Sequence, residues 1–204
     1  MPALDALRDR LRASHTLACG ASVDSVYSHA AWAAALGGVR MPLLADFHPK
    51  GAVASSFGMF LDAAGITDRS TVLIDASGVV RHASSVTPAG KRDMDALLKL
   101  CEELDAGWSE ALPAFDEAPG LPAGTELFVK DSCMFSRWSS YVRTNLALEA
   151  SLPLVNVTRD PAAGERLVAA GGKNQAPALL HGDTVLYESK DINAFLVERA
   201  ADRW

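Results

Sequence analysis

Apolar positions in the first half of the chain alternate between the spacing of helices and the spacing of strands. Near the N-terminus, Leu4, Leu7 and Leu11 fall on one helical stripe, and the apolar runs that follow are bounded by turn residues. The elements predicted, in chain order, are a helix at 2–13, a strand at 16–23, a helix at 24–36, a strand at 41–45, a helix at 51–61, strands at 71–75 and 79–84, and a helix at 91–108. The order αβαβαββα is typical of a mainly parallel sheet covered by helices, with an antiparallel hairpin at its end.

A stretch rich in proline and glycine interrupts this pattern. It predicts a linker at residues 109–124 between one domain at 1–108 and another at 125–204. The elements predicted after it are a strand at 127–129, a helix that follows Cys133, a strand at 152–157, a helix at 161–170, a hairpin turning at 182–183, and a helix from 191. The second half therefore has the order βαβαββα.

Composition excludes several functions. Of the 204 residues, 49% are hydrophobic, so each half is large enough to bury a core. The net charge is −6 without a basic cluster, which argues against nucleic acid or an anionic membrane surface as a partner. No apolar run approaches the roughly 18 residues of a membrane span. Residues 1–13 carry both charge signs, unlike a signal peptide, so we expect a cytoplasmic protein.

The chain has three cysteines, Cys19, Cys101 and Cys133, and five scattered histidines. The odd count and wide spacing argue against a disulfide framework or a zinc cluster, so no metal site is predicted. The first cysteine is expected inside a buried strand and the second on the apolar face of its helix. Tyr27 and Trp32 are predicted to be core residues, and His29 to be a solvated position near the start of its helix.

Cys133 is the candidate nucleophile. It lies between a buried strand and the start of a helix, where unpaired N–H groups and the helix dipole favour a thiolate. Lys130 adds a positive charge nearby, and such settings lower a thiol pKa from about 8.5 to roughly 3.5–7.5. Ser136 takes the place of the second thiol of a Cys-x-x-Cys motif and cannot form a disulfide, so resolution must come from another thiol. The alternative is a buried cysteine that merely begins an ordinary helix.

Residues 3–106 resemble a peroxiredoxin of the thioredoxin-fold superfamily. The resembling stretches are Val23-Asp24-Ser25-Val26-Tyr27-Ser28-His29 with Trp32, Pro42-Leu43-Leu44-Ala45-Asp46, and Arg69-Ser70-Thr71-Val72-Leu73-Ile74-Asp75 followed by Gly78. The resemblance implies that Arg69 is the arginine that polarises peroxide. It also implies a Pro-x-x-x-Thr/Ser-x-x-Cys stretch between a central strand and the first helix, and that stretch is absent.

Three explanations of this absence stay open. The true start lies upstream of Met1, another segment or a partner chain supplies the central strand, or the domain is a remnant. A central strand of a parallel sheet is buried on both faces, so its loss would leave a hole. This chain is therefore expected to have no peroxide reductase activity of its own.

Residues 125–200 resemble glutaredoxins and the N-terminal domain of glutathione S-transferases. The matching motifs are Lys130-x-x-Cys133-x-x-Ser136, a cis proline at Pro177, and Glu188-Ser189 with Ile192. The resemblance implies that the Ala176 backbone pairs with the cysteinyl main chain of glutathione. It implies that Glu188 and Ser189 hold the γ-glutamyl end, and that Lys130 is free for the glycyl carboxylate.

Two departures narrow the function that this second resemblance implies. Met134 stands where iron–sulfur-binding glutaredoxins have glycine, which argues against a cluster. No all-helical domain follows in the sequence, so conjugation to glutathione is not expected.

We therefore interpret the fold as α/β, with two thioredoxin-like domains in tandem and the first lacking its leading strand. The predicted function is a glutathione-linked thiol–disulfide oxidoreductase of a peroxiredoxin–glutaredoxin hybrid type, with exchange at Cys133 and an antioxidant, glutathione-dependent peroxide reductase as the role of the full-length family. Glutathione is the expected co-substrate and a disulfide or glutathionylated thiol, including a peroxiredoxin thiol, the expected substrate. A homodimer is left open. The alternative is a non-catalytic, partner-binding protein with vestigial redox sites.

Overall fold

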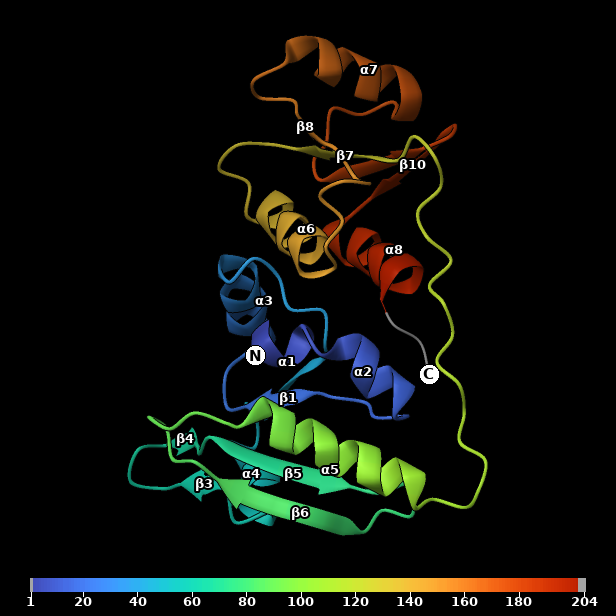
Figure 1. Cartoon of the computed structure of the whole chain (residues 1–204). Helices are drawn as coiled ribbons and strands as arrows, with labels where there is room; N and C mark the ends of the chain where they lie inside the picture. The colour runs from blue at the N-terminus through green and yellow to red at the C-terminus, as the bar shows by residue number, and fades with distance from the viewer. Residues whose placement is uncertain (1, 202–204) are drawn as a thin grey trace. The chain divides into compact units, whose positions relative to one another are not determined.

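The computed structural model describes residues 2–201 and divides the chain into two compact units (Figure 1). Unit 1 comprises Met1–His29 and Met41–Phe115, and unit 2 comprises Ala30–Arg40 and Asp116–Trp204. The change from unit 1 to unit 2 after Phe115 falls inside the stretch predicted as a linker, which carries no helix or strand. The short segment 30–40, by contrast, was not expected to group with the C-terminal half.

The elements up to residue 115 are more numerous than the sequence suggested. They are α1 (Pro2–Asp5), α2 (Arg8–Ala13), β1 (Gly20–Ser22), α3 (Val26–Ala35), β2 (Leu43–Ala45), α4 (Ala52–Ser56), β3 (Phe60–Leu61), β4 (Ile66–Thr67), β5 (Ser70–Ile74), β6 (Val80–Ser85) and α5 (Met94–Ala106). The predicted helix at 51–61 was wrong in its second half, because Gly58 takes a left-handed φ of 68° after α4 and β3 follows.

The strands of unit 1 form three separate two-stranded sheets. β1 and β2 pair in parallel, β5 and β6 form the predicted antiparallel hairpin, and β3 pairs with β4. The expectation of one mainly parallel sheet was therefore wrong. Within the described residues, β1 and β5 each have one hydrogen-bonded neighbour, so no strand joins the two pairs.

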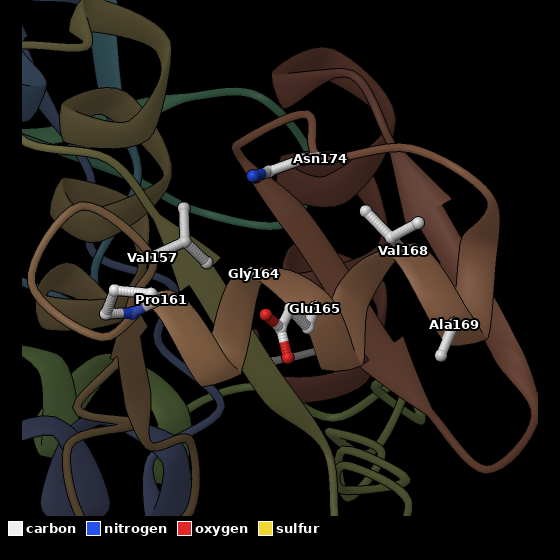
Figure 2. Close-up of a pocket in the computed structure, with 7 residues that line it drawn as sticks. All are labelled: Val157, Pro161, Gly164, Glu165, Val168, Ala169 and Asn174. Atoms are coloured by element: carbon white, nitrogen blue, oxygen red, sulfur yellow. The ribbon is translucent and has the colours of Figure 1, made fainter.

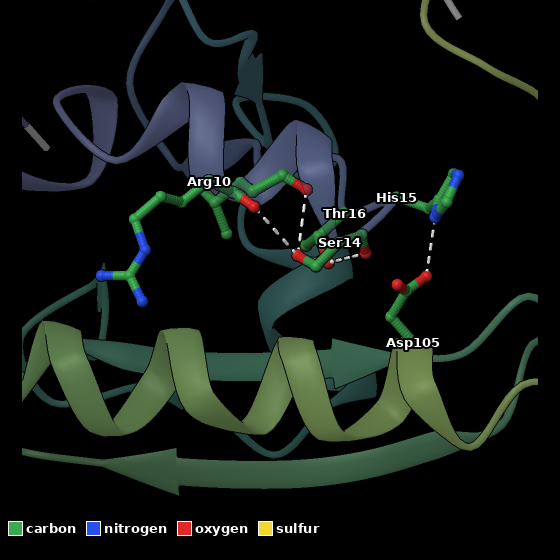
Figure 3. Close-up of polar contacts among 6 residues, drawn as sticks. Arg10, Ser14, His15, Thr16 and Asp105 are labelled. Atoms are coloured by element: carbon green, nitrogen blue, oxygen red, sulfur yellow. Dashed lines mark hydrogen bonds and ion pairs between the residues drawn. The ribbon is translucent and has the colours of Figure 1, made fainter.

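The predicted strand at 16–23 is reduced to β1, and a tight turn precedes it at residues 14–15. Ser14 Oγ donates to the carbonyl oxygens of Arg10 and Leu11, and Thr16 Oγ1 donates to the Ser14 carbonyl (Figure 3). His15 has a positive φ of 45° and its Nδ1 lies 2.7 Å from Asp105 Oδ1 on α5. These contacts end α2 in a tight turn, and the chain becomes a strand only at Gly20.

The core of unit 1 forms where α2 packs on α5. Leu11, Leu98 and Cys101 are buried there, with Leu73 of β5 packed against them. The predicted burial of Cys101 is confirmed. The N-cap of α5 is Asp93, whose carboxylate accepts a hydrogen bond from the Ala96 N–H.

Three side-chain predictions for the segment around α3 were wrong. Its buried positions are His29 and Ala33, four residues apart, so Tyr27 and Trp32 lie on other faces and are exposed. His29 is buried because its Nε2 lies 2.8 Å from Ser22 Oγ on β1.

The C-terminal half follows the predicted order βαβαββα. Its elements are β7 (Glu126–Val129), α6 (Met134–Asn145), β8 (Leu154–Asn156), α7 (Pro161–Gly171), β9 (Ala178–His181), β10 (Thr184–Tyr187) and α8 (Ser189–Ala200). The strands form one four-stranded sheet in the order β10-β9-β7-β8. β7 is parallel to β8 and antiparallel to β9, and β10 is antiparallel to β9.

Successive side chains of β7 point to opposite faces of this sheet, and unit 2 has one core cluster on each face. Leu127 and Val129 are buried with residues of α8 on one face, and Phe128 is buried with residues of α7 on the other. α7 therefore covers one face and α6 and α8 the opposite face (Figure 1). β7 is an inner strand of this sheet, and the loop at 130–132 leads from its end to Cys133, so the sheet supports the segment that carries the candidate nucleophile.

The described residues contain no helix that is long and apolar enough to cross a membrane. They also contain no group of three or more His, Cys, Asp or Glu side chains arranged to hold a metal ion.

Candidate active site

Cys133 lies at the junction of the central strand and α6. It is the N-cap residue of α6, and its Sγ accepts a hydrogen bond from the Ser136 N–H at 3.4 Å. Ser136 is buried, and its Oγ accepts a hydrogen bond from the Lys130 N–H at 3.1 Å. Ser136 thus connects the end of the β7 segment to the first turn of the helix.

The environment of the thiol favours its ionised form. Partial burial raises the pKa of Cys133, but hydrogen bonds from the Ser136 side chain and from the backbones of Ser136 and Phe135 oppose this effect, together with the charge of Lys130. The sum is a pKa below the ordinary value for a cysteine. Helix position and Lys130 were identified from the sequence, whereas the part played by Ser136 as a hydrogen-bond partner was not.

The segment before β9 lies opposite the thiol. The Ala176–Pro177 peptide bond is cis, as the glutaredoxin resemblance implies. Cys133 Sγ lies 3.7 Å from the carbonyl oxygen of Ala176, which accepts a hydrogen bond from the thiol form. Residues from two distant parts of the sequence therefore meet at the sulfur atom.

The loop at residues 174–177 also contacts other predicted site residues. Lys130 Nζ donates to the Asn174 carbonyl at 2.8 Å. Gln175 Nε2 donates to Glu188 Oε1 at 2.8 Å, and Glu188 precedes Ser189, the first residue of α8. One loop thus brings Lys130, Cys133 and Glu188 together.

Two details of this arrangement differ from the sequence interpretation. Lys130 is not free, because one of its donors is used by the Asn174 carbonyl, although an ammonium group has two more. Gln175 was not identified as a site residue. Its place two residues before Pro177 was the only signal in the sequence, and a glutamine at such a position has no distinctive chemistry.

A cavity of about 460 Å³ lies on the α7 side of unit 2 (Figure 2). Its lining consists of Val157, Pro161, Gly164, Glu165, Val168, Ala169 and Asn174. Of the residues discussed for the site only Asn174 belongs to it. The site at Cys133 is a surface arrangement of loops rather than this cavity.

Comparison with known proteins identifies the N-terminal half. A family model described as "AhpC/TSA family" matches residues 1–83. Alkyl hydroperoxide reductase E of Mycobacterium tuberculosis is 39% identical over 104 residues, which cover 48% of this chain and 67% of that protein. The chain belongs to the AhpC/TSA family. The peroxiredoxin resemblance of the first half is therefore confirmed, and this half is a peroxiredoxin-like domain of an antioxidant thiol peroxidase family.

Other members of the AhpC/TSA family and its relatives match smaller shares of their own length. A probable peroxiredoxin, prdx-3, of Caenorhabditis elegans is 35% identical over 134 residues, which cover 57% of this chain and 56% of that protein. Among solved structures, AhpC of Mycobacterium tuberculosis has a TM-score of 0.48 and 25% identity over 52% of this chain and 60% of that chain. The 2-Cys peroxiredoxin of Plasmodium vivax has a TM-score of 0.45 and 30% identity over 49% of this chain and 53% of that chain.

The AhpC/TSA half contains none of the residues that surround Cys133. Arg69 is exposed just before β5. Burial, and then the charge of Arg69, lower the pKa of Arg92, which donates to Thr71 Oγ1 and to the Ser70 carbonyl. The arginine expected to polarise peroxide thus has a second guanidinium within electrostatic range.

The two cysteines of the AhpC/TSA half have raised thiol pKa values, whereas the pKa of Cys133 is lowered. Cys19 was predicted to be buried in a strand, which was wrong, because it is exposed and precedes β1. The protein around it still desolvates the thiol and raises its pKa. Burial also raises the pKa of Cys101. Of the three cysteines, only Cys133 has a lowered pKa.

Proposed function

We propose that the chain is a thiol–disulfide oxidoreductase that exchanges at Cys133 with glutathione as co-substrate. The observation that carries this proposal is the position of the Cys133 thiol. Its Sγ is held at the start of α6 with a lowered pKa and faces the Ala176–Pro177 segment across 3.7 Å. A thiolate in a partly exposed, electropositive setting is the nucleophile that this chemistry needs.

A glutaredoxin-like, thioredoxin-type fold of the second half is part of the proposal. The order βαβαββα, the sheet order β10-β9-β7-β8 and the parallel β7–β8 pair support it. The positions of the motifs also support it, because Cys133 and Glu188 are the N-cap residues of α6 and α8 and Pro177 immediately precedes β9.

Glutathione is proposed to lie along the loop at 174–177. The Ala176 backbone would pair with its cysteinyl main chain, and the Ser189 hydroxyl with the helix-terminal N–H groups of α8 would hold the γ-glutamyl carboxylate. Glu188 would receive the ammonium group. Gln175 donates to the Glu188 carboxylate and keeps that carboxylate close to the loop. The two free donors of Lys130 are left for the glycyl carboxylate.

The proposed reaction begins when the Cys133 thiolate attacks the glutathione sulfur of a glutathionylated thiol. A new S–S bond forms between Cys133 and glutathione, and the substrate leaves as a thiolate that takes up a proton. A second glutathione, as its thiolate, then attacks the glutathione sulfur of this mixed disulfide. Glutathione disulfide leaves and the Cys133 thiolate is restored. Ser136 cannot compete in the second step, because a hydroxyl cannot form the disulfide.

Family membership of the N-terminal half suggests the class of substrate. An oxidised cysteine of an AhpC/TSA protein, present as a glutathione mixed disulfide, fits the exchange described. When the two are tethered in one chain, the effective concentration of such a substrate reaches about the millimolar range.

The test combines alkylation with turnover. The rate of Cys133 alkylation against pH, followed by peptide mapping, is expected to show a midpoint below the roughly 8.5 of a free cysteine. Cys133→Ser should abolish glutathione-dependent reduction of a small mixed disulfide, while Cys19→Ser and Cys101→Ser retain it. An ordinary midpoint for Cys133, or turnover that survives its replacement, would show that the assignment is wrong.

A further inference from the structure

The loop between β7 and α6 is fastened by a group of polar residues just before Cys133. Arg159 donates to both carboxylate oxygens of Asp131, with Nε 2.9 Å from Oδ2 and Nη2 3.0 Å from Oδ1. Asn156 Nδ2 donates to the same carboxylate at 2.8 Å, and the Asp131 N–H donates to Thr158 Oγ1 at 3.1 Å. Asp131 thus has both its side chain and its backbone held by the end of β8 and the residues that follow it.

The partner segment is itself well fixed. Asn156 is the last residue of β8 and pairs in register with Val129, the last residue of β7. The Val157 N–H donates to the Val129 carbonyl, and Asp160 caps the start of α7. The backbone on both sides of Arg159 is therefore fixed, by the sheet before it and by the helix cap after it, and its side chain holds Asp131 of the loop.

The loop needs such support because of its backbone conformation. Ser132, between Asp131 and Cys133, has a φ of 57°, in the left-handed region that residues other than glycine rarely adopt. A residue in this region keeps its conformation only when the contacts around it hold it there. On one side those contacts are the Asp131 interactions, and on the other they are the N-cap hydrogen bonds of α6.

The exposure of the ion pair argues against a role in overall stability. The Arg159 side chain is 74% exposed and that of Asp131 is 38% exposed. Pairs this open to solvent contribute little to folding. Arg159 and Asn156 hold the pKa of Asp131 below its ordinary value, so the carboxylate stays ionised throughout the pH range in which a thiol titrates.

We propose that Arg159 is a positioning residue, which acts through Asp131 to hold Cys133 in its thiolate-stabilising place at the start of α6. This inference rests on the proposed function. Loss of Arg159 has two effects of the same sign. First, the loop can leave the left-handed conformation at Ser132, which weakens the hydrogen bonds to the sulfur. Second, the negative charge of Asp131, two residues before Cys133, is no longer balanced by the charge of Arg159. Both effects favour the protonated thiol and raise the Cys133 pKa.

The experiment compares Arg159→Ala with Arg166→Ala in the full chain. Arg166 forms a bidentate pair with Glu126 at the opposite end of β7 and lies over the Phe128 ring of the same strand, and its side chain is 50% exposed. The Cys133 alkylation rate with iodoacetamide is measured against pH. In Arg159→Ala the midpoint is expected to rise by about 0.5–1 unit, which lowers the rate at pH values below the midpoint by about 3- to 10-fold. Arg166→Ala should match the unsubstituted chain.

Two further variants separate geometry from charge. Arg159→Lys keeps the charge and one donor, so it should restore part of the shift. Asp131→Ala combined with Arg159→Ala removes the unpaired carboxylate, so its midpoint should lie below that of Arg159→Ala alone. If Arg159→Ala does not fold, Arg159→Gln keeps the length of the side chain without its charge and is expected to raise the midpoint by a smaller amount.

The possible outcomes distinguish this inference from the proposed function. An ordinary midpoint for Cys133 in the unsubstituted chain would remove the proposed function itself. A low midpoint there, with Arg159→Ala indistinguishable from Arg166→Ala, would leave the function in place and overturn the positioning role. Equal shifts in both arginine variants would also overturn it, because the effect would then be a general one of surface charge.

Discussion

The AhpC/TSA half and the C-terminal half differ in how their strands are joined into sheets. In the C-terminal half, four strands form one sheet with a buried face on each side. In the described part of the first half, the strands form two-stranded pairs that are not joined to one another. Yet the family match lies in the first half, and the thiol with a lowered pKa lies in the second.

The part of a chain that matches a family and the part that holds a thiol of lowered pKa can therefore be different. A family model responds to the pattern of a whole domain, whereas a site needs a few groups at fixed distances. In the C-terminal half, one continuous sheet supports the segments that carry the proposed site. Because β7 is central and packed on both faces, the residues that follow it begin from a rigid support.

Replacing a core leucine in each unit, for which we expect the largest change in stability, tests whether the two cores are independent. Leu179 and Leu98 are fully buried in clusters that share no residue. Replacing either by alanine should destabilise its own unit by about 2–5 kcal/mol. Leu179→Ala is expected to lower the temperature at which Cys133 loses its fast alkylation, and Leu98→Ala to leave that temperature unchanged. Thermal unfolding followed with the alkylation rate measures both.

Leu179→Met is the matched control, because a swap that conserves volume costs less than about 1.5 kcal/mol. If Leu98→Ala impairs Cys133 as much as Leu179→Ala does, the two halves do not act as independent units.

A smaller effect is expected at the proposed glutathione contacts. Ser189→Ala removes one hydrogen bond to a charged group, worth about 1.5–3 kcal/mol, and Glu188→Gln removes the charge that faces the ammonium. The apparent affinity for glutathione in the reduction of a mixed disulfide should weaken accordingly, with little change in the Cys133 alkylation midpoint. Thr184→Ala, at the exposed start of β10, serves as the control. An unchanged affinity in both site variants would exclude glutathione from this position.

The smallest expected effect concerns peroxide and the AhpC/TSA half. Both cysteines of that half have raised pKa values because their surroundings desolvate them, so at pH 7 they are largely protonated. We expect stopped-flow mixing with hydrogen peroxide to show only the slow oxidation of ordinary thiols, with Arg69→Ala indistinguishable from the unsubstituted chain. Fast peroxide consumption that disappears in Cys19→Ser would contradict this and give the first half a catalytic thiol.

Several elements could be predicted from the sequence because local rules determine them. The hairpin of β5 and β6 follows from two apolar runs around Ala76-Ser77-Gly78. α7 follows from Asp160 and Pro161 at its start and Gly172 at its end. The place of Cys133 at the start of a helix was equally local, since strand, thiol and helix lie within a few residues. Its cis proline partner was inferred from resemblance alone.

Other features were decided only by tertiary structure. The strand expected at 16–23 begins only at Gly20, and the turn before it places His15 Nδ1 2.7 Å from Asp105 Oδ1, 90 positions away. His29 is buried through a contact with Ser22, and Lys130 is engaged by a carbonyl 44 positions away. The Asp131–Arg159 pair joins residues 28 positions apart. Local propensity determines which elements form, but a hydrogen bond between distant residues exists only after the sheet has brought their strands together.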